Sequence, residues 1–141
     1  MSTNPQSMND AFEKAFNYLL TATNSESNRN AFRYFLPDQA NVWAAGLSGG
    51  ESGHLAGCTA DTMRMDLTIR GRWKSIAEAH EFVMGCLSIV PVRSDTPIIM
   101  LHADQNPTIV ESVEVIANAA AANVFFLTTQ VLQLVWDARK G

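Results

Sequence analysis

The middle of the chain, from Met63 to Trp73, alternates apolar and polar side chains without interruption. The first phase consists of Met63, Met65, Leu67, Ile69, Gly71 and Trp73. The second phase consists of Arg64, Asp66, Thr68, Arg70 and Arg72. Successive side chains of a strand point to opposite faces, so the pattern predicts a long strand with one buried face and one polar, basic face. The remaining elements must then cover the apolar face.

A helix is predicted directly after this strand. The segment from Ser75 to Glu78 has the form of a capping box, in which the serine hydroxyl accepts a backbone N–H and the glutamate reaches back to the serine N–H. Apolar residues then recur at helical spacing as far as Pro91, which ends the helix. These residues are Ile76, Ala79, Val83, Cys86, Leu87 and Val90. Strand, turn and helix form one unit.

An amphipathic helix is predicted near the N-terminus, over residues 8–22. Its apolar positions are Met8, Phe12, Ala15, Phe16, Leu19 and Leu20. Residues 1–7 are polar and we expect them to be frayed. Residues 21–30 are polar without periodicity and are predicted to form a linker.

The other segments predict short strands separated by turns. Residues 31–36 fit either a short strand or one helical turn. Strands are predicted at 41–47, 98–101, 109–116 and 123–137, with turns at 93–97 and 104–107, a flexible glycine-rich loop at 46–60, and a connection at 118–123. The predicted fold is therefore a single α+β domain, with a small, mostly antiparallel sheet packed by the N-terminal helix and the central capped helix.

The last strand, 123–137, is apolar on both faces. Val124, Phe126 and Leu132 belong to one face, and Phe125 and Val131 belong to the other. Apolar residues on both faces mean that both faces are covered. We expect the chain's own helices to cover one face and a neighbouring subunit to cover the other, which makes Val131 and Leu132 candidate contact positions on opposite faces.

Length and composition limit the classes of function. The chain has 141 residues and 47% hydrophobic residues, enough for one domain with a core. The formal net charge of -4 gives no support for general or specific nucleic-acid binding, which needs a basic field. A signal peptide is not expected from the polar N-terminus, and no apolar run has the length of a membrane span, so we expect a protein made in the cytosol without membrane association. Reduced thiols are favoured for Cys58 and Cys86, although their pairing stays open.

The sequence contains no convincing catalytic, cofactor or metal motif. Residues 47–51 (LSGGE) look like the signature motif of ABC-type ATPases, but a phosphate loop is missing. The histidines, His54, His80 and His102, are scattered and have no metal-ligand spacing. Cys86 lies on the apolar side of its helix, which favours a small core residue over a nucleophile. We therefore expect neither an enzyme nor a cofactor site.

Two groups of polar residues are candidate contacts with other subunits. Arg64, Arg70 and Arg72 share one strand face, which is either simply solvated or forms a polar interface or the lumen of a ring. Gly49, Gly50 and Glu51 lie in the predicted glycine-rich loop, and such loops commonly become ordered against a partner.

The order of these elements resembles the tail terminator, or tail completion, proteins of long-tailed bacteriophages. The resemblance lies in the strand-turn-helix segment Thr62–Val90 and the final strand Val124–Asp137, and it covers most of the chain as a pattern without an invariant motif. It implies a small α+β domain that assembles into a ring, commonly a hexamer, in the virion tail after synthesis in the host cytoplasm. It also implies partners, namely the tail tube protein and a head-completion or neck protein, and no catalytic residues.

Two alternatives to a terminator remain. Neck and tail tube proteins share the fold that this resemblance implies, so the chain could be another component of that group. A small α+β module that binds a ligand or peptide is the other alternative, and it requires a concave apolar pocket with convergent polar groups.

Overall fold

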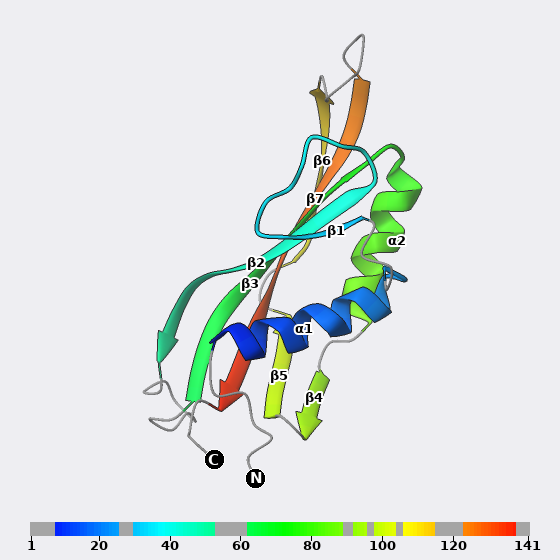
Figure 1. Cartoon of the computed structure of the whole chain (residues 1–141). Helices are drawn as coiled ribbons and strands as arrows, with labels where there is room; N and C mark the ends of the chain where they lie inside the picture. The colour runs from blue at the N-terminus through cyan, green and yellow to red at the C-terminus, as the bar shows by residue number, and fades with distance from the viewer. Residues whose placement is uncertain are drawn as a thin grey trace.

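The computed structural model describes residues 8–25, 30–52, 62–88, 92–95, 98–103, 106–114 and 123–137. Within these residues, two helices and seven strands form an α+β fold, as the sequence predicts (Figure 1). The elements are α1 (Met8–Ala22), β1 (Ala31–Arg33), β2 (Val42–Ser52), β3 (Thr62–Trp73), α2 (Ile76–Leu87), β4 (Val92–Asp95), β5 (Ile98–Ala103), β6 (Thr108–Glu114) and β7 (Asn123–Asp137).

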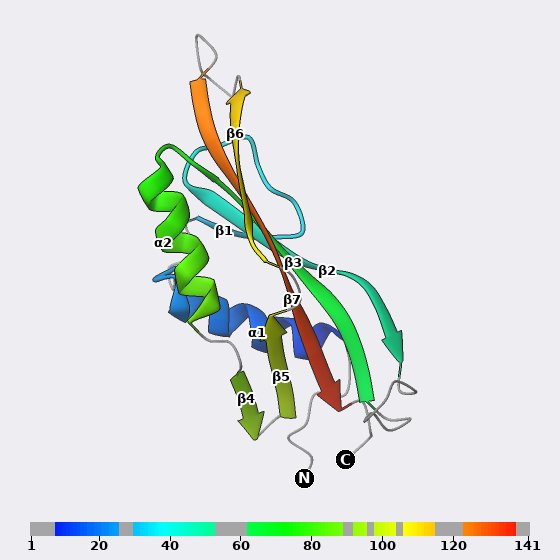
Figure 2. The ribbon, with the colours of Figure 1, turned by 180° about the vertical axis from the view of Figure 1, so that it is seen from behind.

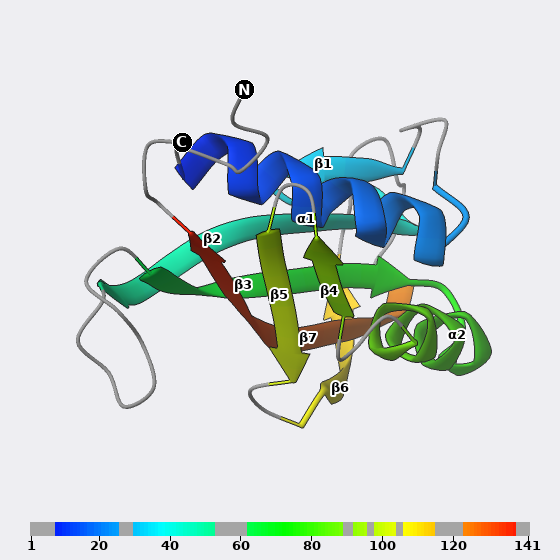
Figure 3. The ribbon, with the colours of Figure 1, turned by 90° about the horizontal axis from the view of Figure 1, so that it is seen from below.

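The strands form one sheet in the order β1-β2-β3-β7-β5-β4. Only the β1–β2 pair is parallel; the other pairs of this sheet are antiparallel. The two longest strands, β3 and β7, pair along the full length of β3 and form the centre of the sheet. Strands β5 and β6 both pair with the opposite edge of β7, β5 beside its C-terminal half and β6 beside its N-terminal half (Figure 3).

Both helices pack against one face of this sheet. Their apolar residues join those of the strands in a single core, in which three tryptophans, Trp43, Trp73 and Trp136, are buried. On β3 the core takes the predicted apolar phase, with Leu67 and Ile69 fully buried. In the reverse view β7 crosses in front of α1 (Figure 2). The alternation that predicted β3 therefore corresponds to a face under the helices and a face away from them.

The two predicted helices are confirmed, including the first half of the capping box. Ser75 has an extended backbone conformation, and its hydroxyl accepts a hydrogen bond from the backbone N–H of Glu78 at 3.2 Å. Ile76, named among the apolar positions of the predicted helix, does not join the core, and its side chain is 43% exposed. Phe82 instead packs against Trp43 and Trp73 from the inner face of α2.

Several predicted boundaries differ from the structure. The glycine-rich loop begins later than predicted, because β2 continues through Gly46 and Gly50 to Ser52 and stays paired with β3. The register shifts between Ser48 and Gly50, so Gly49 is the extra residue of a β-bulge, a place where glycine is favoured. Strand β4 occupies residues 92–95, where the first part of a turn at 93–97 was predicted. Residues 31–33 form a strand and not a helical turn.

Helix α2 ends at Leu87, and the predicted end of this helix at Val90 and Pro91 lies outside the described residues. The remaining predictions for 1–7, 26–29, 53–60, 96–97, 104–105 and 115–122 also lie outside them, as do His54 and Cys58.

Candidate functional site

The face of the sheet that points away from the helices, here called the far face, carries four of the eight predicted contact residues. Arg64, Arg70 and Arg72 occupy alternate positions of β3 and therefore share this face. Val131 pairs with Thr68 and belongs to the same face. Leu132, its neighbour, lies in the core under the helices and is 1% exposed. The structure thus separates the two candidate positions on β7 into one core residue and one residue of the far face.

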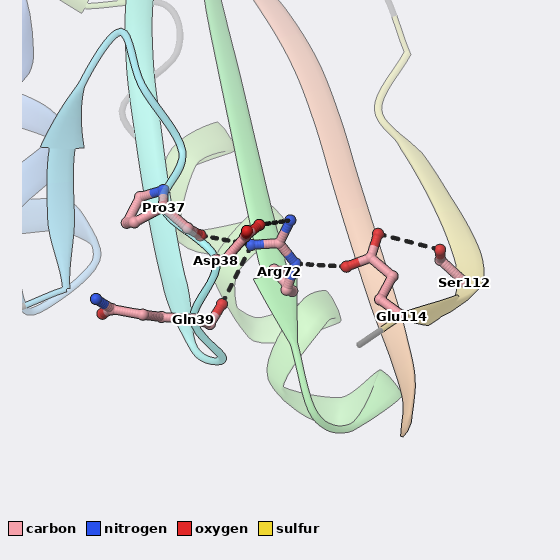
Figure 4. Close-up of polar contacts among 6 residues, drawn as sticks. All are labelled: Pro37, Asp38, Gln39, Arg72, Ser112 and Glu114. Atoms are coloured by element: carbon pink, nitrogen blue, oxygen red, sulfur yellow. Dashed lines mark hydrogen bonds and ion pairs between the residues drawn. The ribbon is translucent and has the colours of Figure 1, made fainter. Parts of the chain in front are cut away.

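Arg72 is buried, and its guanidinium joins three separate segments of the chain (Figure 4). Its Nε donates to Glu114 Oε1 on β6 at 2.7 Å. Its Nη1 donates to the carbonyl oxygens of Pro37 at 2.6 Å and Gln39 at 3.3 Å, and Asp38 Oδ1 lies 3.9 Å from its Nη2. Arg72 therefore ties the β1–β2 connection, residues 34–41, to β3 and β6.

This connection covers one end of the far face. Val42 is buried there beside Arg72. In the register, Phe125 lies between the level of Arg72 and that of Glu114, and it is also buried. The Ser112 hydroxyl donates a hydrogen bond to the other carboxylate oxygen of Glu114, Oε2, at 3.2 Å. The end of the far face near Arg72 is therefore filled by the chain itself, and Arg72 has an internal role that the sequence pattern does not reveal.

Tyr34 lies next to this network, in an unusual backbone conformation. Its φ is 67°, a left-handed value that costs about 1–3 kcal/mol for a bulky residue. Three contacts maintain it: Tyr34 N donates to Ala45 O at 2.9 Å, Arg70 Nη2 donates to Tyr34 O at 2.9 Å, and the ring packs beside Phe12. A Cβ at Gly46 would lie 2.5 Å from the ring, so only glycine leaves room for it.

A hollow with a volume of about 250 Å³ opens beside Tyr34. Its lining residues are Tyr34, Gly46, Leu47, Ser48, Thr68 and Arg70. Arg70 is exposed there, and the hydroxyls of Ser48 and Thr68 lie 2.9 Å apart. We call this set of residues the Tyr34 surface. It combines an aromatic ring, hydroxyls and a guanidinium, a chemistry suited to a carboxylate next to small apolar groups.

The other predicted contact residues are less informative. Arg64 is half-buried on the far face and takes part in an interaction. Gly49, Gly50 and Glu51 belong to the last part of β2, where Gly50 pairs with Met65 and Glu51 with Arg64. Arg70 belongs to the Tyr34 surface, and Val131 lies beside this surface because it pairs with Thr68, whereas the glycine segment lies farther along β2.

One exposed region was missed by the sequence interpretation. The paired strands β6 and β7 extend beyond the ends of both helices (Figures 1 and 2). Three valines on this β6–β7 ribbon are exposed, Val110 by 56%, Val113 by 68% and Val124 by 46%. Val113 and Val124 are direct cross-strand partners. Apolar residues on both faces of β7 were visible in the sequence, but no local signal showed that the ribbon leaves the helix layer.

A second cavity, of about 220 Å³, lies between the end of α1 and the start of α2. Trp73 and Phe82 form its aromatic side, and Glu78 and Glu81 bring carboxylates to it. The buried Ser25 hydroxyl is already engaged by the indole N–H of Trp43 at 3.2 Å.

Two kinds of titratable group in the described residues have a shifted pKa, a buried thiol and a surface ion pair. Burial raises the pKa of the Cys86 thiol far above its ordinary value, which opposes formation of a nucleophilic thiolate. On the surface, a hydrogen bond from Arg33 lowers the pKa of Glu13. No group of three or more histidine, cysteine, aspartate or glutamate residues in the described part of the chain is placed to hold a metal ion.

Comparison with known proteins does not assign the chain to a family. No protein-family model matches it, and no curated protein matches its sequence. Neither helix in the described ranges has the length and hydrophobicity needed to cross a membrane.

Proposed function

We propose that this protein is a structural assembly protein of a bacteriophage tail, which forms a ring that terminates the tail tube and joins it to the head or neck. The observation that carries the proposal is the one-sided helix layer. Both helices pack on one face of a mostly antiparallel sheet, and the far face keeps half-buried Leu127 and Val131 beside the exposed Arg70. Strand β3 is followed directly by helix α2, and this strand-turn-helix order is the pattern on which the resemblance to tail terminator proteins rests.

Assembly into a ring explains why some apolar side chains are not covered by other parts of the same chain. Each exposed large aliphatic side chain that becomes buried stabilises an interface by about 1.5–3 kcal/mol, and a closed ring repeats the same contact at every interface. The valines of the β6–β7 ribbon are residues of this kind, and the exposed ring of Tyr34 adds aromatic area. In this proposal the partners are further copies of the chain, commonly in a ring of six, together with a tail tube protein and a head-completion or neck protein, and the site of action is the virion tail.

A ligand-binding module is supported less well. Sites for small molecules are usually concave, largely apolar and about 300–1,000 Å³ in volume. The cavity beside Trp73 is smaller, about 220 Å³, and several of its lining residues are asparagines and glutamates. Another neck or tail tube protein of the same group remains the nearer alternative, because it also requires ring formation.

The mass of the protein in solution tests the proposal. Light scattering coupled to size-exclusion chromatography should give a defined multiple of the 15.4 kDa subunit, and negative-stain images should show rings. Purified tail tubes then separate a terminator from a tube component, because a terminator should bind one tube end and stop further growth. A protein that stays monomeric at high concentration and in the presence of tube ends contradicts the proposal.

A further inference from the structure

We propose that the β6–β7 ribbon of one copy docks on the Tyr34 surface of the next copy, with Glu111 of the ribbon paired to Arg70 of its neighbour. This inference rests on the proposed ring and names the two surfaces that would build it. The contact is heterologous, meaning that two different patches of the chain meet, which is the type of contact that generates rings.

The two surfaces point to opposite sides of the sheet. Arg70 belongs to the far face. Glu111 pairs with Phe126, which pairs with Trp73 of the core phase, so Glu111, Val113 and Val124 belong to the face on the helix side. Glu111 and Arg70 therefore cannot meet within one chain, whereas a second copy can supply the contact.

The ribbon has the properties of an inserted element. It extends past the helix layer, and Val113 and Val124 form an exposed apolar pair on one of its faces (Figure 2). Glu111 is exposed two residues before Val113 and therefore lies on the same face. Apart from its pairing with β7, β6 has no strand partner in the described residues. The ribbon thus presents one carboxylate next to two valines.

The Tyr34 surface has the complementary charge and shape. Arg70 spends one guanidinium donor on Tyr34 O and has further donors for a carboxylate, which arginine binds well. The hollow of about 250 Å³ beside it can receive a valine side chain. Tyr34 itself is 54% exposed, and its neighbour Phe35 is 73% exposed, so aromatic area is available around the guanidinium.

The strained backbone of Tyr34 is an independent reason to assign a function to this surface. A left-handed conformation at a bulky residue persists only where surrounding contacts enforce it, and such residues are concentrated at functional sites. Here a hydrogen bond on each side of the residue and a glycine under the ring hold the conformation. These contacts place the aromatic ring at the surface instead of in the core. The strained backbone thus presents the ring where a second copy can contact it.

Charge reversal tests the pairing directly. Glu111→Arg and Arg70→Glu should each weaken self-association at least about tenfold, because like charges then face each other at every interface. An equimolar mixture of the two variants should assemble again, since each ribbon then meets a surface of opposite charge. Alternation closes only rings with an even number of subunits, which a hexamer satisfies. Sedimentation velocity measures all three samples, and circular dichroism checks that each variant is folded.

The controls separate this inference from the proposed function. Glu81→Arg and Lys14→Glu make the same charge changes on exposed or half-exposed helix positions outside both surfaces and should leave assembly unchanged. Val113→Asn tests the ribbon without altering Arg70 and should also weaken association at least about tenfold. A ring that survives every one of these changes, or a mixture that fails to assemble, overturns this interface but leaves the ring itself. A wild type that never self-associates overturns both.

Discussion

The guanidinium of Arg72 on β3 reaches across β7 to the carboxylate of Glu114 on β6, at a distance of 2.7 Å (Figure 4). Both side chains are largely removed from water, and the same guanidinium binds two carbonyl oxygens of the β1–β2 connection. Hydrogen bonds to charged groups are about twice as strong as neutral ones, and leaving such a group without its partner is costly. The pair therefore holds together three parts of the chain that are distant in sequence.

Replacement of Arg72 should destabilise the subunit. Arg72→Ala leaves Glu114 and the carbonyls of Pro37 and Gln39 without their donor, so we expect a loss of about 2–3 kcal/mol in the free energy of unfolding. Urea denaturation measures it. Asp38→Asn is the matched control, because Asp38 is exposed and 3.9 Å from the guanidinium, and it should change little. Equal midpoints for the two variants would show that the buried pair does not stabilise the fold.

The N-cap of α2 gives a second stability prediction. Ser75→Ala removes the acceptor for the Glu78 N–H and should cost about 1 kcal/mol. Ser75→Asp retains an acceptor at the positive end of the helix dipole and should keep most of the stability. The comparison is made by chemical denaturation. If the alanine variant unfolds at the wild-type midpoint, the serine hydroxyl contributes nothing to α2.

The features of this fold that depend on neighbouring residues could be predicted from the sequence, whereas those that depend on contacts between distant residues could not. The bounds of α1 and β7 and the inner face of β3 follow from side-chain periodicity, which is a local property. The extension of β2 to Ser52 could not be predicted, because glycines weaken a strand locally and pairing with β3 overrides that preference. Long-range contacts determine the candidate site: Arg72 binds Glu114 from 42 positions away, and nothing local distinguishes it from Arg70.

The core contains an imperfection that a substitution can correct. Gln130 is buried beside Cys86, and its amide nitrogen and oxygen have no strong hydrogen-bond partner, because the neighbouring group is a thiol, which forms only weak hydrogen bonds. A buried polar group without a partner costs about 1–3 kcal/mol. Gln130→Met keeps a similar shape without the amide and should raise the free energy of unfolding by about 1 kcal/mol. Thermal and urea unfolding check it, and a lower midpoint would mean that the amide is satisfied in solution.

The ion pair between Glu13 and Arg33 gives a small pH dependence. The hydrogen bond from Arg33 Nε, 2.7 Å long, lowers the pKa of Glu13 in the folded state. The ion pair therefore stabilises the folded state at pH values above the ordinary glutamate pKa of about 4.3. This stabilisation is lost as the pH falls through the lower pKa that Glu13 has in the folded state. Because both side chains are partly exposed, Glu13→Gln should cost less than about 1 kcal/mol at pH 7. A difference from wild type that persists undiminished in strong acid contradicts this linkage.

Adjacent positions of β7 should respond oppositely to the same charge. Leu132 is 1% exposed among core residues from both helices, so Leu132→Asp buries a carboxylate without a partner and should unfold the subunit. Val131 is half-buried on the far face opposite Thr68, where a carboxylate can reach water. Val131→Asp should therefore stay folded by circular dichroism. Because Thr68 lines the Tyr34 surface, the new charge should repel Glu111 of the docking copy and weaken assembly.

Light scattering on the folded Val131→Asp protein completes this test, and Val131→Asn is its uncharged control. Loss of the ring in the aspartate variant, with retention in the asparagine variant, attributes the effect to charge on the far face. An intact ring in both variants would move the interface away from Val131. Unfolding of Val131→Asp would mean that Val131 is as inaccessible to water as the core residues. The apolar side chains of β7 would then stabilise the single subunit and not an interface.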